Sequence, residues 1–261
     1  MGLVFVKQLL ENMGNDMEYF SRRATVRSFD PTRHIADETL REIVEKAAHA
    51  PNTGNMQLYS VVSTREIGMK AKVSKLHYDQ PAAKGADVLL TVCADTRRFE
   101  AWCGARDARS GLNNFGGRLS AVVDASILAQ QIVTIAEMMG IGCCYLGTAM
   151  YNADDFSQLR HLPEGVIPVV GIAMGYPLQE EAKGSDRLPA DAILHEETYS
   201  DYTAADIDRI YKEKESLPES EGFIKENGKS TLAQVYADVR YPAELNKAVG
   251  EKMLRLMKAG E

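Results

Sequence analysis

The pattern of hydrophobic and polar positions along the chain predicts buried strands that alternate with amphipathic helices. From Leu40 to Ala48, apolar residues recur three and four positions apart, which is the spacing of one buried helix face. We expect Asp37 to be the N-cap of this helix and Pro51 to stop it, because proline disfavours helical backbone at the residue before it. Apolar runs predict strands at 58–64, 87–95, 143–147 and 166–175.

The longest apolar stretch, from about Leu119 to Met139, predicts a buried core helix. It contains Asp124, Glu137 and two glutamines, and such groups are costly in lipid, so we do not expect it to span a membrane. The preceding residues, 98–118, are rich in Gly, Arg and Asn and predict an irregular loop or lid. Further helices are predicted at 153–162, 204–214 and 245–257, and a mobile excursion at 212–229.

Composition and charge narrow the classes of function. The 261 residues are 45% hydrophobic and 26% charged, which is typical of a globular protein, and the net charge of −7 argues against a protein that mainly grips nucleic acid. The four cysteines form no C-x-x-C pair and no zinc-binding pattern, so we expect free thiols, no metal and a reducing, cytoplasmic compartment. Residues 1–20 lack the features of a signal peptide and predict an amphipathic helix or extension.

Three segments carry candidate chemistry. In "SRRATVRSF", Arg23 and Arg27 flank Thr25, and guanidinium groups with a hydroxyl match phosphate oxygens, although a lone arginine cluster is more often a solvated patch. The turn "PNTGN" carries more hydrogen-bond donors than a helix stop requires. The glycines of "GIGCCYLGT" allow close backbone approach, either to a packed element or to a flat ligand. No P-loop, Rossmann glycine motif, H-E-x-x-H or G-x-S-x-G is present.

The order of these motifs closely resembles the FMN-dependent nitroreductase family. "RRATVRSF", "APNTGNMQLYSVV", "DASILAQQIVTIAEMMGIGCCYLG", "PVVGIAMGYP" and "DRLP" follow one another between about Ser21 and Tyr199. Within the family the chain is most similar to the larger, NADPH-preferring, oxygen-insensitive nitroreductase and flavin reductase branch. The resemblance implies an α+β sandwich, with a mostly antiparallel central sheet wrapped by helices, in an interlocked homodimer that binds FMN at the subunit interface.

The resemblance also implies a division of the chain and a set of flavin contacts. Residues 1–20 would be an N-terminal extension, 21–200 the FMN-binding core and 201–261 a C-terminal helical extension or dimer-embracing arm. Arg23 and Thr25 would hold the flavin phosphate, and Arg27 would place positive charge near the pyrimidine edge of the ring. The other implied contacts are Ala24, Pro51, Asn52, Thr53 and Asn55 (lining the flavin of the other subunit), Gln80, Tyr145, Leu146, Gly147, Thr148 (with backbone near flavin N5) and Arg187.

The implied activity is a ping-pong, two-electron reduction of nitroaromatics, quinones or free flavins by NADPH or NADH. The partners would be a second copy and a small-molecule acceptor, with no nucleic acid and no membrane. The chain departs from the family at Ser185, where a lysine is usual, and Lys183 is the candidate replacement. Lys225, Lys229 and Arg240 are candidates for a 2′-phosphate site, although a solvated charged face is an equal interpretation.

Three alternatives remain open at this stage. The same flavin scaffold serves reductive dehalogenation, flavin breakdown and azoline or enoate redox chemistry, and the fold alone does not choose among them. A flavin-binding sensor would bind without turnover, and an acidic interaction protein would bind no flavin at all. The choice of acceptor is expected to depend on the irregular loop at about 102–117, which no general sequence rule interprets.

Overall fold

The computed structural model describes residues 17–178 and 184–258, which belong to two compact units. The first unit holds the chain up to residue 183 together with 251–261, and the second unit is 184–250. Residues 17–22 are helical. The rest of the predicted N-terminal extension, 1–16, lies outside the described residues.

A four-stranded antiparallel sheet forms the centre of the first unit, in the order β1-β2-β4-β3. The four predicted strands are confirmed, and so is the α+β class with its antiparallel sheet. Every residue of β2 and nearly every residue of β4 is buried, because helices cover both faces of the sheet. The strands are β1 Tyr59–Thr64, β2 Val88–Asp95, β3 Gly142–Leu146 and β4 Val166–Gly175.

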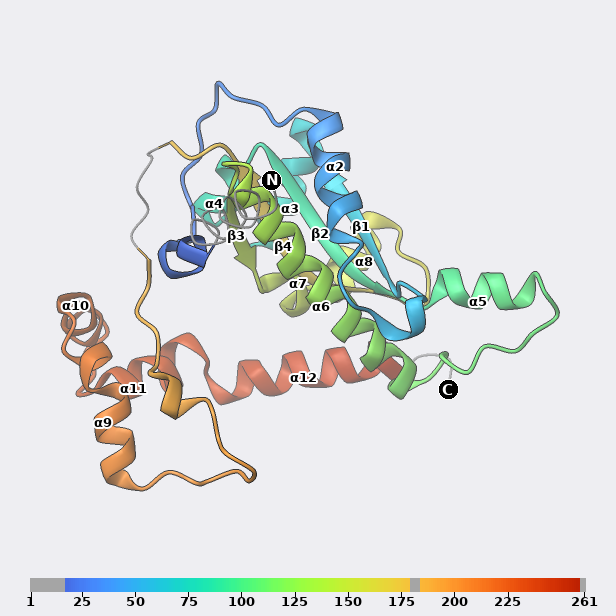
Figure 1. The fold of residues 1–261 in the computed structure, drawn as a ribbon. Coiled ribbons are helices and arrows are strands. Elements are labelled where there is room, and N and C mark those ends of the chain that lie inside the picture. The colour runs from blue at the N-terminus through green and yellow to red at the C-terminus, as the bar shows by residue number, and fades with distance from the viewer. Residues whose placement is uncertain (1–16, 179–183, 259–261) are drawn as a thin grey trace, which may run out of the picture. The chain divides into compact units, whose positions relative to one another are not determined.

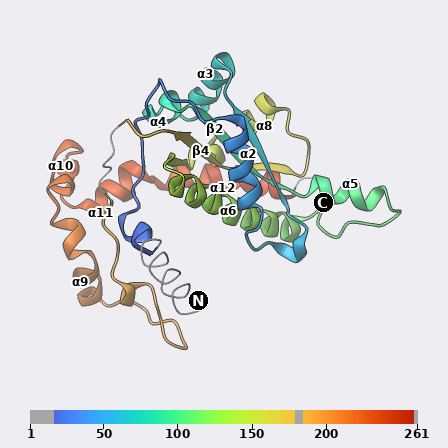
Figure 2. The same cartoon turned by 45° about the horizontal axis from the view of Figure 1, so that its top comes forward.

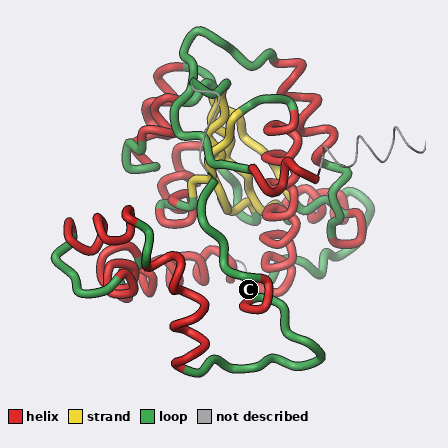
Figure 3. The backbone as a smooth tube through the Cα atoms, turned by 60° about the vertical axis from the view of Figure 1, so that its left-hand side comes forward, coloured by secondary structure: helices red, strands yellow, loops and turns green. Residues whose placement is uncertain are grey.

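Helices lie on both faces of the sheet (Figure 1), and the side chains of β2 alternate between the two core clusters. Val88, Leu90 and Val92 join one core cluster with α2 (Asp37–Ala47) and α6 (Phe115–Met138). Leu89 points to the other side, into a second cluster. That layer contains α3 Ile67–Leu76, α4 Pro81–Gly85, α7 Thr148–Tyr151 and α8 Ala153–Arg160. Figure 3 shows the strands enclosed between these helices.

The long helix α6 is the main support of the sheet. By length and composition it could cross a membrane, which by itself is weak evidence, but its inner face is packed in the protein core. Ala121, Ala125 and Ala129 are fully buried on that face, and their small side chains allow the helix to lie close to the strands. The predicted core helix is therefore confirmed, with a start at Phe115 rather than at Leu119.

Local signals account for most differences between prediction and structure. Asp37 is the first residue of α2 and not its N-cap, which is Ala36, and the Asp37 carboxylate pairs with Arg65 at 3.2 Å. The stretch 98–118, predicted to be irregular, is partly helical, since α5 spans Arg97–Gly104. The helices α3, α4 and α7 were not predicted, because short helices present too few turns to show a period.

The last turns of α12 (Ala243–Lys258) belong to the first unit and are anchored by buried and surface contacts. Arg118 is 1% exposed, and its guanidinium donates to the carbonyl of Leu256 at 2.9 Å and to Asn113 at 2.6 Å. Lys252 donates to the carbonyl of Tyr151 at 2.7 Å. Because these partners are spread over the first unit, the end of the chain is part of its core.

The second unit consists mainly of short helices, drawn in orange in Figure 2. The capping box of Thr203 and Asp206 begins α9, and Pro218 occupies the first turn of α10, where its missing N–H costs nothing. The stretch 212–229, predicted as an excursion, forms the end of α9 and all of α10. The elements are η2 Ala190–Ala192, α9 Ala204–Glu215, α10 Pro218–Glu226, α11 Leu232–Gln234 and the π-helix η3 Val235–Arg240.

Candidate active site

The arginine motif lies along the edge of the sheet because glycines make room for it. The Val26 N–H donates to the carbonyl of Cys143 in β3 at 3.1 Å, and Phe29 forms a bridge to Pro177. A Cβ on Gly142 would come 2.7 Å from the Val26 side chain, and one on Gly175 would come 2.9 Å from Phe29. One glycine of "GIGCCYLGT" therefore serves packing, and the motif is held against β3.

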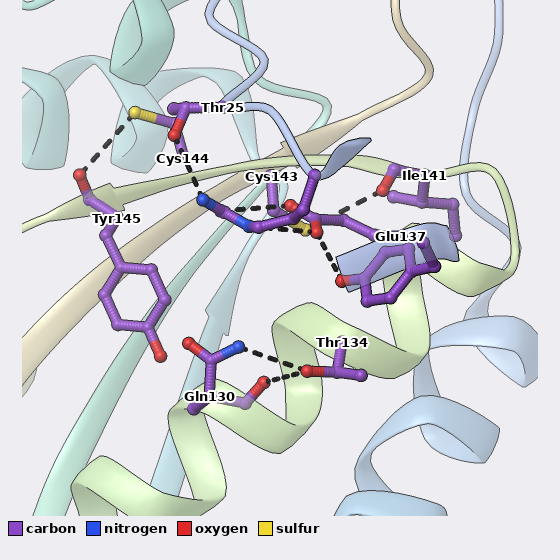
Figure 4. Close-up of polar contacts among 10 residues, drawn as sticks. Thr25, Gln130, Thr134, Glu137, Ile141, Cys143, Cys144 and Tyr145 are labelled. Carbon is purple, nitrogen blue, oxygen red and sulfur yellow. Dashed lines mark hydrogen bonds and ion pairs between the residues drawn. The ribbon is translucent and has the colours of Figure 1, made fainter. Parts of the chain in front are cut away.

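Arg23 is oriented by a carboxylate of α6. Its Nε and Nη2 donate to the two oxygens of Glu137, each at 3.1 Å, and Tyr19 donates to the same carboxylate at 2.6 Å (Figure 4). The remaining Nη1 reaches the Thr25 hydroxyl at 3.5 Å. Burial and the hydrogen bond to Glu137 raise the pKa of Tyr19. The fork of Arg23 is thus fixed at one edge, and its other edge is directed to Thr25, where the motif predicts a phosphate.

Arg27 differs from Arg23 in having no internal counter-charge. It is exposed and makes no hydrogen bond or ion pair with any residue in the described ranges 17–178 and 184–258. Both guanidinium groups nevertheless influence the same side chain, the Cys144 thiol of β3. Burial raises the pKa of the Cys144 thiol, and the positive charges of Arg27 and Arg23 oppose that rise. Their fields therefore overlap at β3, as an anion site requires.

The end of β3 presents an open surface next to these arginines. Tyr145 is 36% exposed, and its ring extends from the strand toward Gln130 of α6 (Figure 4). Burial is the main cause of its raised phenol pKa. Leu146 is buried, whereas an added Cβ on Gly147 would meet no atom within 4 Å. The last glycine of the motif therefore borders open space, which a flat ligand could use.

The "PNTGN" turn is held by a second carboxylate of α6. Asp124 is 2% exposed and accepts hydrogen bonds from the N–H and the hydroxyl of Thr53 at 2.9 and 2.8 Å, and from the Leu58 N–H at 3.4 Å. Gly54 and Asn55 have φ of 54° and 57°, a conformation in which glycine and asparagine are favoured. The hydrogen bonds to Asp124 and the positive φ angles thus explain most of the polar and glycine residues of this turn.

Only part of the turn remains free to bind a ligand. Asn52 accepts from the Gln57 N–H at 3.2 Å and donates to the carbonyl of Ala50 at 3.3 Å, so its amide is largely used within the turn. Pro51 and Asn55 are exposed. Any ligand contact by this segment therefore falls mainly to these two residues and to the backbone.

Gln80 and Thr148 are connected through a histidine that the sequence did not single out. Gln80 precedes α4, and its N–H donates to the carbonyl of His77 at 3.2 Å. The His77 ring is fully buried, and its Nδ1 lies 2.7 Å from the Thr148 hydroxyl. The two predicted contacts thus belong to one connected piece of structure.

Arg187 belongs to the second unit, whereas the other predicted flavin contacts belong to the first. It is exposed, and its guanidinium donates to the carbonyls of Ser185 and Asp186 at 3.0 and 2.8 Å. Lys183 lies outside the described residues. Of the other cations proposed for this unit, Lys229 pairs with Asp238 at 2.7 Å and Arg240 lies over the ring of Phe223.

Comparison with known proteins identifies the family of the chain. The family model described as "Nitroreductase family" matches residues 20–176, more than half of the chain. The chain belongs to the nitroreductase family. It is similar to an FMN reductase [NAD(P)H] of Bacillus subtilis, with 31% identity over 80% of this chain and 86% of that protein.

Solved nitroreductase-like structures agree over almost the whole chain. A crystal structure from Bacteroides fragilis has a TM-score of 0.89 and 43% identity, and covers 92% of this chain and 97% of its own. The NfrA1 nitroreductase of Bacillus subtilis has a TM-score of 0.75 and 26% identity, with 91% and 98% covered. The resemblance found in the sequence is therefore confirmed.

Sequence reasoning missed the anchors of this nitroreductase site. Asp124 and Glu137 were noticed only as polar groups in an apolar helix, although a charge in a buried helix is itself a signal that a partner must be near. His77 is not preceded by such a signal, because the sequence around it does not predict a buried segment. Within the ranges 17–178 and 184–258 no group of three His, Cys, Asp or Glu residues could hold a metal ion. Cys143 and Cys144 are buried free thiols, as expected.

Replacing Asp124 with Asn should release the turn that Asp124 holds. The amide keeps the volume but cannot accept as strongly from two N–H groups and a hydroxyl, so the free energy of unfolding should fall by about 2 kcal/mol. Hydrogen exchange at Thr53 and Leu58 should be about tenfold faster. Asp155→Asn, at an exposed position of α8, is the control. Unchanged protection in Asp124→Asn would contradict the anchoring role.

His77 should make the protein less stable in acid. Burial and the nearby charge of Arg160 lower its pKa from 6.5 to about 4. Between these values the unfolded chain binds a proton that the folded chain does not, so the free energy of unfolding falls as the pH falls through this window, by about 3 kcal/mol in total.

Urea unfolding at pH 7 and pH 4.5 measures this loss. His77→Gln should reduce the difference between the two pH values, whereas His49→Gln, at an exposed position, should leave it unchanged. An equal pH dependence in wild type and His77→Gln would show that other groups cause the loss.

Proposed function

We propose that this nitroreductase-family chain is an FMN-dependent NAD(P)H oxidoreductase that reduces nitroaromatics, quinones or free flavins by two electrons. The observation that carries the proposal is the arginine motif fixed beside the open end of β3. Arg23 directs one edge of its fork to Thr25, Arg27 is uncompensated, and Gly147 borders open space. The named activities of the relatives, including an NADPH nitroreductase of Salmonella typhimurium, are of the same class.

The donor set fits FMN. The Arg23 guanidinium and the Thr25 hydroxyl suit the phosphate, the charge of Arg27 suits the pyrimidine edge, and the exposed Tyr145 and Gly147 suit a planar ring. FMN, when bound, supplies the redox chemistry by which hydride from NAD(P)H is passed as two electrons to an acceptor. The chain supplies binding, orientation and positive charge. Ala24, Leu146, Thr148 and Gln80 complete the proposed set, with Arg187 of the second unit as a further phosphate ligand.

We further propose that the site requires a second copy of the chain. Asp124 and Glu137 are thirteen residues apart on α6, which places the turn and the arginine motif about 20 Å apart along the helix axis. This separation leads us to assign the turn to the flavin of another copy. Around Asp124, α6 exposes Leu119, Val123 and Ile127, spaced four residues apart on one side. Such an apolar stripe supports an isologous contact between two copies.

The C-terminal region is proposed to take part in the same assembly. The second unit is an extension beyond the sheet, and its exposed aromatic residues Tyr199, Phe223 and Tyr241 would be covered more favourably in a dimer than in water. The buried free thiols support a reducing, cytoplasmic location.

The proposed function is tested by the absorption spectrum of the protein after reconstitution with FMN, followed by anaerobic addition of NADPH or NADH. We expect a bound oxidised-flavin spectrum that is bleached by at least one donor. Bound flavin that neither donor reduces would favour a sensor. Absence of binding would refute the proposal.

Arg27→Ala should weaken FMN binding about 10- to 100-fold, since a charge-assisted contact is worth about 1.5–3 kcal/mol. Arg22→Ala is the matched control, because Arg22 is a surface arginine of the same motif whose partner is Glu18, four residues earlier. Its effect should stay within about twofold. Fluorescence titration of the flavin measures both dissociation constants, and equal values would contradict the site.

Val123→Glu should separate the proposed dimer, because two buried carboxylates would meet near the symmetry axis. Sedimentation velocity should show a dimer for wild type and a monomer for the variant. Lys72→Glu places a carboxylate at an exposed position of α3, with a larger change of net charge, and should remain dimeric. A wild-type monomer, or a dimer unaffected by Val123→Glu, would rule out this interface.

A further inference from the structure

His77 occupies a pocket shaped for its ring. It follows α3, is fully buried, and its ring centroid lies 5.0 Å from that of Phe156. On β4, a Cβ at Gly171 would come 2.6 Å from His77 Cε1, so only glycine leaves room for the imidazole. A buried imidazole costs more than a phenyl ring unless its nitrogens are used, so packing alone does not explain the residue.

One ring nitrogen has a partner and the other has none. Nδ1 lies 2.7 Å from the Thr148 Oγ1, whereas Nε2 is buried without a hydrogen bond to any described residue. An unpartnered N–H is costlier than an unpartnered lone pair, so the proton of the neutral ring belongs on Nδ1. His77 therefore donates to Thr148, and burial keeps the ring neutral at pH 7 by lowering its pKa to about 4.

The turn after His77 is fastened to the same region. Asn152 donates to the carbonyl of Leu76 at 2.6 Å and accepts from the Tyr78 hydroxyl at 3.4 Å. Tyr78 and Asp79 both have positive φ, of 54° and 51°, a strained conformation that persists only where the surroundings hold it. Gln80 ends this turn.

We infer that His77 is a positioning residue of the flavin site, which joins Thr148 to the turn ending at Gln80 and so holds both segments in one arrangement. The inference rests on the proposed function, because it gives Thr148 and Gln80 their ligand. A buried donor on the protein side of Thr148 fixes the hydroxyl rotamer and the start of α7, and leaves the Gly147–Thr148 backbone free on its outer side. We therefore expect His77 to affect the placement of Thr148 and Gln80 more than the free energy of unfolding.

The test compares His77→Phe with Ser74→Ala. The first keeps an aromatic ring but removes the bond to Thr148. The second removes another buried hydrogen bond of the same layer, from Ser74 to the carbonyl of Ala83 at 3.2 Å, without touching Thr148. FMN affinity, the visible circular dichroism of bound flavin and urea unfolding are measured on the full chain for each variant.

We expect His77→Phe to weaken FMN binding about tenfold and to change the flavin dichroism, as the loss of one buried hydrogen bond allows. Ser74→Ala should lower stability but affect both flavin readouts much less than His77→Phe does. His77→Asn, which retains a donor, should recover part of the affinity. Equal flavin readouts in His77→Phe and wild type would overturn the inference, as would an equal effect of Ser74→Ala.

Thr148→Val provides the test from the other side of the bond if His77→Phe does not fold. It should weaken FMN binding to a similar degree, and Thr148→Ser, which keeps the hydroxyl, should weaken it less. Where both single variants fold, the double variant should be no weaker than the weaker single one, because both remove the same interaction. Additive losses would overturn the inference. Failure of the wild type to bind FMN would instead refute the proposed function, and the inference with it.

Discussion

Two carboxylates on one buried helix organise the parts of this protein that face a ligand. Asp124 holds the "PNTGN" turn through the backbone and hydroxyl of Thr53, and Glu137 holds Arg23 by both oxygens. Each carboxylate lies in a poorly solvated place, which is tolerated because several donors surround it. The interior of α6 thus fixes the positions of surface groups, and the inner face of the helix packs on the sheet.

The balance of charge at the arginine motif follows from this arrangement. Glu137 compensates Arg23, so the motif keeps one fully uncompensated cation, Arg27. Compensation allows Arg23 to remain partly buried and preorganised, at the cost of a weaker field on an incoming anion. The uncompensated Arg27 restores that field at the exposed side. A pair of arginines with different roles therefore gives both orientation and attraction, which two solvated arginines would not.

The sequence predicted the architecture better than the supports of the site. Long buried strands and α6 have strong periods and lengths, so their existence and type were clear. The order of motifs also indicated the family. A short helix such as α4 has too few turns to show a period, and the bond between His77 and Thr148 joins residues 71 apart in the chain, which no local pattern encodes. In "PNTGN" part of the composition serves the fold, because Thr53 donates to Asp124 and Gly54 has a positive φ, while its flavin contacts stay a prediction.

The separation of the two anchors along α6 also links assembly to ligand binding in the proposed dimer. Each chain offers an arginine motif and, about 20 Å along the helix, a turn that is proposed to complete the site of another copy. A flavin contacted from both chains stabilises the dimer, and by reciprocity the dimer strengthens flavin binding. The exposed stripe of Leu119, Val123 and Ile127 surrounds the Asp124 anchor on the same helix, so the surface proposed to join the copies and the surfaces proposed to hold the ligand are set by one helix.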